Sequence, residues 1–313
     1  VGPALGRQAA RVRFRGMLRS MRISQTSARY LAEYAAFRLA GAVFGLLPVD
    51  AASAFGGSIL RLVGRFSSKR NARAHANLAA AFPDWPNERV AAATADMWEN
   101  LGRVFAESFH LDRLARGDRF TFGNPDTFAR LGKSRRGDIV CASHAGNWEA
   151  AVIGLTTIRP DLSVASIYRH LNNPKVDAYV STLRKRFYKG GLFVKSASAP
   201  RYLMRHAKAG GTLAMLADLR EFKGPSVPFF GRAAPSSAFP ALAAVTLDAK
   251  LYAGHVERIG GARFKIDLVE IPVARSGDRE ADILATTAAL HAEFERQIRR
   301  RPEQWMWSHR RWG

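Results

Sequence analysis

Two side chains that can perform acid–base chemistry, His144 and Glu149, lie five residues apart. An apolar run at 139–142, which is typical of a short buried strand, leads into the pair, and a helix-like apolar stretch follows at 148–155. On one continuous helix the two side chains would point roughly 140° apart, whereas a strand–turn–helix corner can bring the carboxylate onto the imidazole. A carboxylate that accepts from one ring nitrogen leaves the other nitrogen basic, so the pair is expected to act as a general base toward a hydroxyl.

The same spacing also fits a purely structural role. His144 could cap the helix that follows, and Glu149 would then be an acidic side chain of its first turn, where the helix dipole favours negative charge. The turn is nevertheless expected at the carboxyl end of a strand, which is where open α/β sheets bind their ligands. Spacing alone leaves the catalytic and the structural interpretations open.

Charge and cysteine content restrict the partners and the compartment. The 313 residues carry a formal net charge of +22, and 47% of them are hydrophobic, which is enough for a core. Three polyanions fit this charge: nucleic acid, an anionic membrane surface and an acidic carrier protein. Nucleic acid is not expected as a partner, because the arginines are spread along the chain and no helix-turn-helix, zinc or base-stacking motif stands out. The single cysteine, Cys141, excludes an internal disulfide framework, fits a reducing compartment and is interpreted as a small core residue.

The N-terminal part divides into a basic tail and an apolar helical segment. Residues 1–29 contain seven arginines and no acidic residue, and this mobile tail is expected either to attract anionic lipid headgroups or to be an unstructured leader. Residues 30–64 are expected to form a membrane-associated helical segment, a hairpin in the membrane interface with Pro48 at its turn. A single spanning helix near 31–47 and an ordinary buried helix pair are the alternatives. The arginine excess before the segment is a positive-inside signal, which places the tail in the cytoplasm.

The remaining residues, 65–313, are expected to form one domain. A long amphipathic helix is expected at 87–111 and a linker at 116–125. Strands and helices then alternate, which predicts an α/β fold with a mixed, mainly parallel sheet flanked by helices. Strands are expected at 139–142, 162–168, 191–195, 212–217, 251–256 and 264–271, and helices at 148–155, 174–188, 199–209, 239–247 and 280–299.

The residues around the His144–Glu149 pair resemble a known family. The run HAGNWE matches the H-x4-D/E motif of bacterial glycerolipid-type acyltransferases, and three further blocks resemble the lipid A late acyltransferases (lauroyl and myristoyl transferases) in order and spacing. H-x4-E alone is a weak pattern, whereas four blocks in one order are a specific one. The likeness runs from about residue 30 to the C-terminus, and the further blocks are Tyr168–Pro174, Asp218 with Val227–Gly231, and Pro302–Trp312.

The resemblance implies a glycerolipid-acyltransferase-like fold, an acyltransferase domain at 65–313 and transfer of an acyl chain from acyl-carrier protein to a hydroxyl of a lipid A precursor. His144, oriented by Glu149, would deprotonate the hydroxyl. The thioester oxyanion would be held by Arg169 together with backbone N–H groups near Gly146 and Asn147. No His-Glu-x-x-His motif and no P-loop occurs in the sequence, so neither a metal nor a cofactor is expected.

Other residues of the matched blocks are expected to bind substrate. The family's usual glutamine after Asp218 is Leu219 here, which weakens the case for a substrate contact at this position. The apolar, turn-rich segment at 227–231 could shape an acyl pocket or belong to the core. The tryptophans of the last block suit a membrane interface or a sugar-phosphate headgroup, although a packed C-terminal segment is the favoured interpretation. The expected substrate-binding residues are Asn147, Trp148, Tyr168, Asn172, Asp218, Phe229 and Phe230.

The donor and the acceptor are inferred from the resemblance alone. An acidic acyl-carrier protein could dock on the basic cluster at 184–189, but a coenzyme A thioester would fit the motif as well. H-x4-E would look the same in an enzyme that acylates another membrane lipid or glycolipid. The same pair acting on water would make a thioesterase, which would release free fatty acid without an acceptor lipid.

Overall fold

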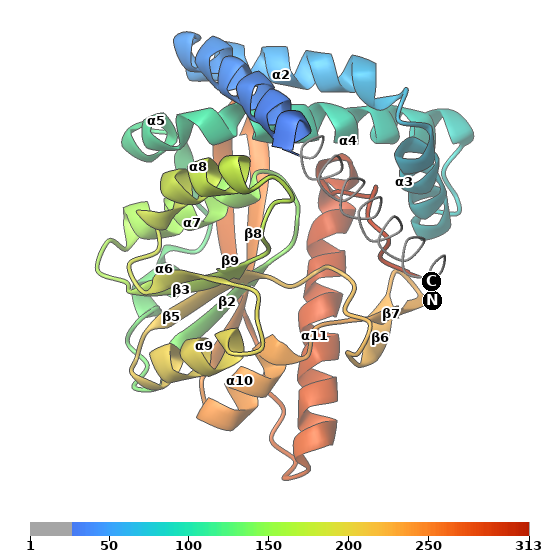
Figure 1. Ribbon diagram of the computed structural model, residues 1–313. Coiled ribbons are helices and arrows are strands. Elements are labelled where there is room, and N and C mark those ends of the chain that lie inside the picture. Colours follow the sequence, from blue (N-terminus) through green and yellow to red (C-terminus); the bar gives the residue numbers. More distant parts are fainter. Residues whose placement is uncertain (1–26, 313) are drawn as a thin grey trace, which may run out of the picture.

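The fold is built on a seven-stranded sheet with helices on both faces (Figure 1). The computed structural model describes residues 27–312, so the predicted basic tail at 1–29 lies almost wholly outside it. The strands of the sheet are β1 (Phe120–Phe122), β2 (Asp138–Ala142), β3 (Val164–Tyr168), β4 (Gly191–Val194), β5 (Thr212–Leu216), β8 (Lys250–Gly260) and β9 (Arg263–Ile271). Their order is β1-β9-β8-β2-β5-β3-β4, and all neighbours are parallel except β8 and β9. The predicted mixed, mainly parallel sheet is confirmed.

Side chains of the central strand β2 alternate between two cores. Ile139 and Cys141 pack into the core that includes α9, α10 and α11, whereas Val140 packs into the core that includes α5, α6 and α7. A strand buried on both faces must be apolar throughout, which explains the uninterrupted apolar run of the sequence here. The bounds of these helices are α5 Leu111–Arg116, α6 Pro125–Arg130, α7 Trp148–Ile158, α9 Ala199–Lys208, α10 Phe239–Leu247 and α11 Arg279–Arg300.

Two regions that were predicted to be irregular contain regular structure. The linker expected at 116–125 includes β1, which extends the sheet beside β9. The segment at 227–231 lies in a separate hairpin of β6 (Ser226–Phe229) and β7 (Arg232–Pro235). Both elements have four residues or fewer on each strand, which is too short for hydrophobic periodicity to reveal them.

A layer of helices covers the end of the sheet where the turn that carries His144 lies (Figure 1). It contains a helix at 27–46, then α2 (Val49–Gly64), α3 (Ser68–Ala81) and α4 (Asn87–Glu107). The first helix stops before Pro48, so the predicted turn is present at this residue, which has no N–H to continue a helix. Within residues 27–312, no helix combines the length and the hydropathy needed to cross a bilayer.

Helices α2 and α4 cross at two glycines. A Cβ on Gly102 would lie 2.1 Å from the carbonyl oxygen of Gly56, and a Cβ on Gly56 would lie 2.6 Å from the carbonyl oxygen of Gly102. Such short distances to backbone atoms leave no room for a side chain at either position. Gly56 and Gly102 therefore serve the close packing of these two helices.

Gly102→Ala is expected to lower the free energy of unfolding by about 2 kcal/mol, because the added methyl group overpacks the α2–α4 crossing. Urea denaturation followed by circular dichroism would measure the change. Gly45→Ala is the matched control, since a Cβ there meets no atom within 4 Å, and its better helix propensity should stabilise the chain by up to about 1 kcal/mol. Equal effects of the two substitutions would contradict the proposed crossing.

Candidate active site

A cavity of about 660 Å³ reaches the carboxyl ends of β2, β3 and β5. His144 belongs to its wall, together with residues that follow the other two strands. The part between the sheet and α7 is apolar and includes Phe128, Val140, Val152, Leu155, Ile266 and Leu268. An apolar interior that ends at polar groups suits a ligand with an aliphatic chain and a polar reacting centre.

Strand register brings His144 and Asp218 together. β2 and β5 are parallel neighbours with Ala142 opposite Leu216, and His144 and Asp218 each follow two residues later. Nδ1 of His144 lies 2.7 Å from Oδ1 of Asp218. Because a carboxylate only accepts hydrogen bonds, Nδ1 carries the proton and Nε2 is the basic nitrogen. Nε2 has no hydrogen-bond partner among residues 27–312.

Asp218 is fully buried and accepts three hydrogen bonds. Besides Nδ1 of His144, the backbone N–H of His144 donates to it at 2.9 Å and the indole N–H of Trp305 at 2.7 Å. Burial by itself would raise the pKa of the carboxyl, but electrostatic attraction to the His144 ring and these hydrogen bonds together hold the pKa well below its usual range. A permanently ionised Asp218 therefore fixes the tautomer and the orientation of the imidazole.

The turn that carries His144 is hydrogen-bonded to the C-terminal segment. The N–H of Gly146 donates to the carbonyl of Gln304 at 3.0 Å, and the N–H of Met306 donates to the carbonyl of His144 at 3.1 Å. Gly146 has a φ of 57°, and a Cβ on it would lie 2.0 Å from the carbonyl oxygen of Val256. Since its N–H is already used, Gly146 cannot supply the oxyanion donor that the sequence suggested.

Glu149 is hydrogen-bonded to Arg184 of α8 (Pro174–Lys185) and not to the imidazole. Nε of Arg184 lies 2.9 Å from Oε2 of Glu149, and Nη2 contacts Oε1. The side chain of Asn147 caps α7 and places Glu149 in its first turn, while Nδ1 of His144 faces the neighbouring strand and Asp218. The expected His144–Glu149 pairing is thus replaced by two separate pairs, and all of these residues except Asn147 and Asp218 line the cavity.

A buried carboxylate on α4, Glu107, connects the helical layer to the catalytic turn. It accepts from Ser53 Oγ at 2.5 Å and from Asn147 Nδ2 at 2.7 Å, and it forms an ion pair with Arg258 at the end of β8. Asn100, also on α4, donates to the carbonyl of Gly146 at 2.9 Å. The long helix α4 therefore helps to position the turn that carries His144.

The remaining predicted residues fall into two groups. Trp148, Tyr168 and Arg169 line the cavity, and the ring centroids of Trp148 and His144 are 5.2 Å apart. Asn147, Asn172, Phe229 and Phe230 do not line it. Asn147 is the buried cap of α7, and Asn172 is exposed.

Phe229 and Phe230 belong to a buried aromatic cluster. Phe230 lies 5.3 Å from Trp307 and Phe229 lies 5.8 Å from Trp312, measured between ring centroids. Trp305 joins the same cluster, and all three tryptophans are buried. The pocket role is thus excluded for this phenylalanine pair, and the packed interpretation of the C-terminal tryptophans is confirmed.

The sequence matches one model of a protein family over nearly its whole length. The family described as bacterial lipid A biosynthesis acyltransferase matches residues 21–313. The chain belongs to this family. No curated protein matches the chain significantly. As a member of this family, the protein is an acyl-transferring enzyme. His144, which is hydrogen-bonded to Asp218, lies in the wall of its cavity. Within residues 27–312, no cluster of three or more histidine, cysteine or acidic side chains could hold a metal ion.

Stability of this lipid A acyltransferase is expected to fall between pH 6.5 and pH 4. Burial lowers the pKa of His255 to about 4, so this histidine is neutral in the folded chain, and neither ring nitrogen has a partner among the described residues. The contribution of neutral His255 to the free energy of unfolding is complete above its unfolded-state pKa and is lost as the pH falls through its folded-state pKa. His255→Met should therefore reduce the acid-induced loss by about 3 kcal/mol, as measured by urea denaturation at both pH values. His75→Gln is the control and should leave the loss unchanged, because the His75 side chain forms no hydrogen bond or ion pair with any residue of 27–312.

Proposed function

We propose that this acyltransferase moves a fatty acyl chain from acyl-carrier protein to a hydroxyl of a lipid A precursor, with His144 as general base and Asp218 as its positioning partner. The observation that carries this proposal is that His144, in the wall of an apolar cavity, is hydrogen-bonded to the buried Asp218. With Nδ1 protonated and committed to Asp218, Nε2 is available to take a proton from a hydroxyl. The pairing of Glu149 with Arg184 makes Glu149 a positioning residue in this scheme, not the orienter of the base.

The proposed reaction is a direct transfer. The acceptor hydroxyl gives its proton to Nε2 of His144 while its oxygen attacks the thioester carbonyl carbon. Arg169, at the cavity wall, stabilises the oxyanion of the tetrahedral intermediate. The carbon–sulfur bond then breaks, and the leaving thiolate takes the proton back from Nε2. One ester forms, one thioester is consumed, and His144 returns to its neutral state.

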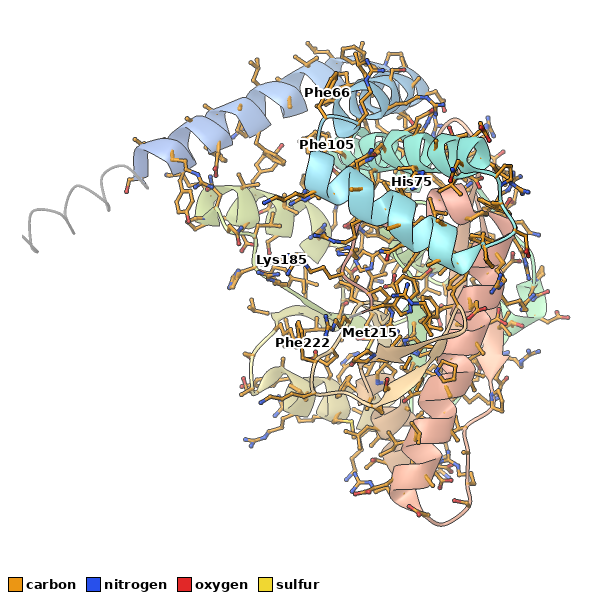
Figure 2. All side chains as sticks on the ribbon, turned by 90° about the vertical axis from the view of Figure 1, so that its right-hand side faces the viewer. Phe66, His75, Phe105, Lys185, Met215 and Phe222 are labelled. Atoms are coloured by element: carbon orange, nitrogen blue, oxygen red, sulfur yellow. The ribbon has the colours of Figure 1, made fainter. Side chains whose placement is uncertain are left out.

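The proposed donor is an acidic carrier protein, which the net charge of +22 would attract. Two residues of the predicted docking cluster at 184–189 already form ion pairs within the chain, Arg184 with Glu149 and Arg186 with Asp112. Lys185 is exposed between them, and Figure 2 shows it on the same side of the molecule as Phe222. We therefore place the docking surface around Lys185 and the cavity opening.

The proposed location is the cytoplasmic face of the inner membrane, where such an acceptor lipid would be reached. The helix at 27–46 and α2 support this proposal, because they leave large apolar side chains exposed. Leu46 is 86% exposed, and Phe66, just beyond α2, is 72% exposed (Figure 2). Exposed apolar surface of this kind marks a membrane or partner contact.

The test is acyl transfer from a labelled acyl-carrier protein to a tetraacylated, Kdo-bearing lipid A precursor in detergent. His144→Ala should lower the rate by roughly a hundredfold or more, the size expected for removing a general base. Circular dichroism would check that the variant is folded. Transfer that survives the substitution would overturn the mechanism. Release of free fatty acid at a rate independent of acceptor would instead identify a thioesterase, and transfer only to a different lipid would change the acceptor.

A further inference from the structure

A second cavity, of about 410 Å³, lies in the helical layer between α2, α3 and α4. It shares no lining residue with the catalytic cavity. Trp98 and Leu62 form part of its apolar wall, and the indole N–H of Trp98 donates to Asn71 Oδ1 at 2.9 Å. Three cationic or ionisable side chains also line it: Arg61, Arg65 and His75.

Two of these three side chains have no counter-ion among residues 27–312. Arg61 is paired with Asp96 and Glu99. The side chains of Arg65 and His75, in contrast, make no hydrogen bond or ion pair with any residue of 27–312. The guanidinium of Arg65 lies over the ring of Phe66, 5.0 Å from its centroid. Residues 1–26 contain no aspartate or glutamate that could neutralise them. The cavity is therefore suited to an anion that comes from outside the chain.

An exposed apolar stripe adjoins this cationic cavity. Phe55, Ile59 and Leu62 recur at helical spacing along α2, and Phe66 continues the row beyond its end. Their exposed fractions are 48%, 41%, 53% and 72%. Leu62 belongs to both the stripe and the cavity wall, so the apolar surface runs directly into the site of positive charge. Figure 2 shows Phe66 and His75 on this part of the helical layer.

We propose that the cavity binds the phosphate headgroup of an anionic membrane phospholipid, with Arg65 and His75 donating to the phosphate and the α2 stripe lying among the acyl chains. A phospholipid joins an anion to apolar chains, as the cavity joins the arginine and the histidine, both potential hydrogen-bond donors, to an apolar stripe. Free phosphate would occupy the cavity but leave the stripe exposed. The inference rests on the proposed membrane location, and it adds a defined headgroup site to a general surface attraction.

Vesicle flotation of the full chain tests the proposal. Wild type is expected to float with phosphatidylcholine vesicles containing phosphatidylglycerol at about one part in four, and only weakly with phosphatidylcholine alone. Arg65→Ala combined with His75→Ala should weaken binding to the anionic vesicles by about fivefold or more. Arg89→Ala removes an equally exposed cation of α4 that does not line the cavity, and it should change binding much less. Thermal melting would confirm that each variant is folded.

A charge-neutral variant separates a headgroup site from diffuse attraction. Ala91 lines the cavity and is exposed, so Ala91→Gln fills part of the space without altering the net charge. It should weaken binding to the anionic vesicles as the double substitution does. If Ala91→Gln binds like wild type, or if Arg89→Ala loses as much as the double variant, the headgroup site is refuted. Loss of flotation by wild type with both vesicle types would instead refute the membrane location itself, and flotation blocked by millimolar inorganic phosphate would show that the cavity binds free phosphate.

Discussion

Asp218→Asn is expected to lower the turnover number for acyl transfer by about three to four orders of magnitude. The carboxylate accepts from Nδ1 of His144 and so keeps Nε2 unprotonated. An asparagine amide could donate to Nδ1 instead, which would move the proton to Nε2 and remove the base. The measurement is the steady-state rate with saturating acyl donor and acceptor lipid. The Michaelis constants should change little, because Asp218 does not line the substrate cavity.

Trp305→Phe is the graded control for this prediction. It removes one of the three hydrogen bonds to Asp218 but keeps an aromatic ring in the buried cluster. The backbone N–H of His144 still donates to the same carboxylate oxygen, so a loss of about tenfold is expected, on the order of one net hydrogen bond. A fully active Asp218→Asn beside an inactive Glu149→Gln would contradict the assignment and restore the pairing of His144 with Glu149.

The local elements of the fold could be predicted because their signals are local. The apolar run before His144 becomes β2, and the stretch from Trp148 becomes α7, with Asn147 as its cap. The alternation of strands and helices beyond residue 126 was sufficient for the mixed, mainly parallel sheet. The short strand β1 escaped because three residues show no period.

The site partners could not be predicted because they depend on strand order. Asp218 is 74 residues from His144, and the two meet only because β5 lies next to β2 in register. Glu149 is closer in sequence, but its helix directs it to Arg184, 35 residues away. The sequence carried one usable signal, since Asp218 directly follows the strand expected at 212–217. The sequence did not show which strand lies next to β2 in the sheet.

Arg258→Met is expected to lower the free energy of unfolding by about 3–5 kcal/mol, because it leaves the buried Glu107 carboxylate without its ionic partner. Glu107 has no exposed surface, so water cannot replace the guanidinium. Ser53 and Asn147 would still donate to it, but two neutral donors do not compensate a charge in this environment. Urea denaturation at neutral pH is the measurement. Arg296→Met breaks an exposed ion pair with Glu293 and should change stability by less than about 1 kcal/mol.

Arg258→Met should also lower the turnover number under conditions where the chain remains folded. Glu107 holds Asn147, and Asn147 caps the helix that follows the catalytic turn, so loss of Arg258 would loosen the turn even where the chain remains folded. At a temperature where Arg258→Met is fully folded, its turnover number should therefore still be reduced, by about tenfold or more if the base is displaced by an ångström.

Restoring neutrality with Glu107→Gln in the same chain should recover part of the stability, because the uncompensated charge is gone. It should not recover the turnover number to the same extent, since the amide cannot reproduce the full set of hydrogen bonds that the carboxylate accepts. Parallel recovery of both quantities would mean that the ion pair acts on stability alone and that the helical layer does not position the catalytic turn through Glu107.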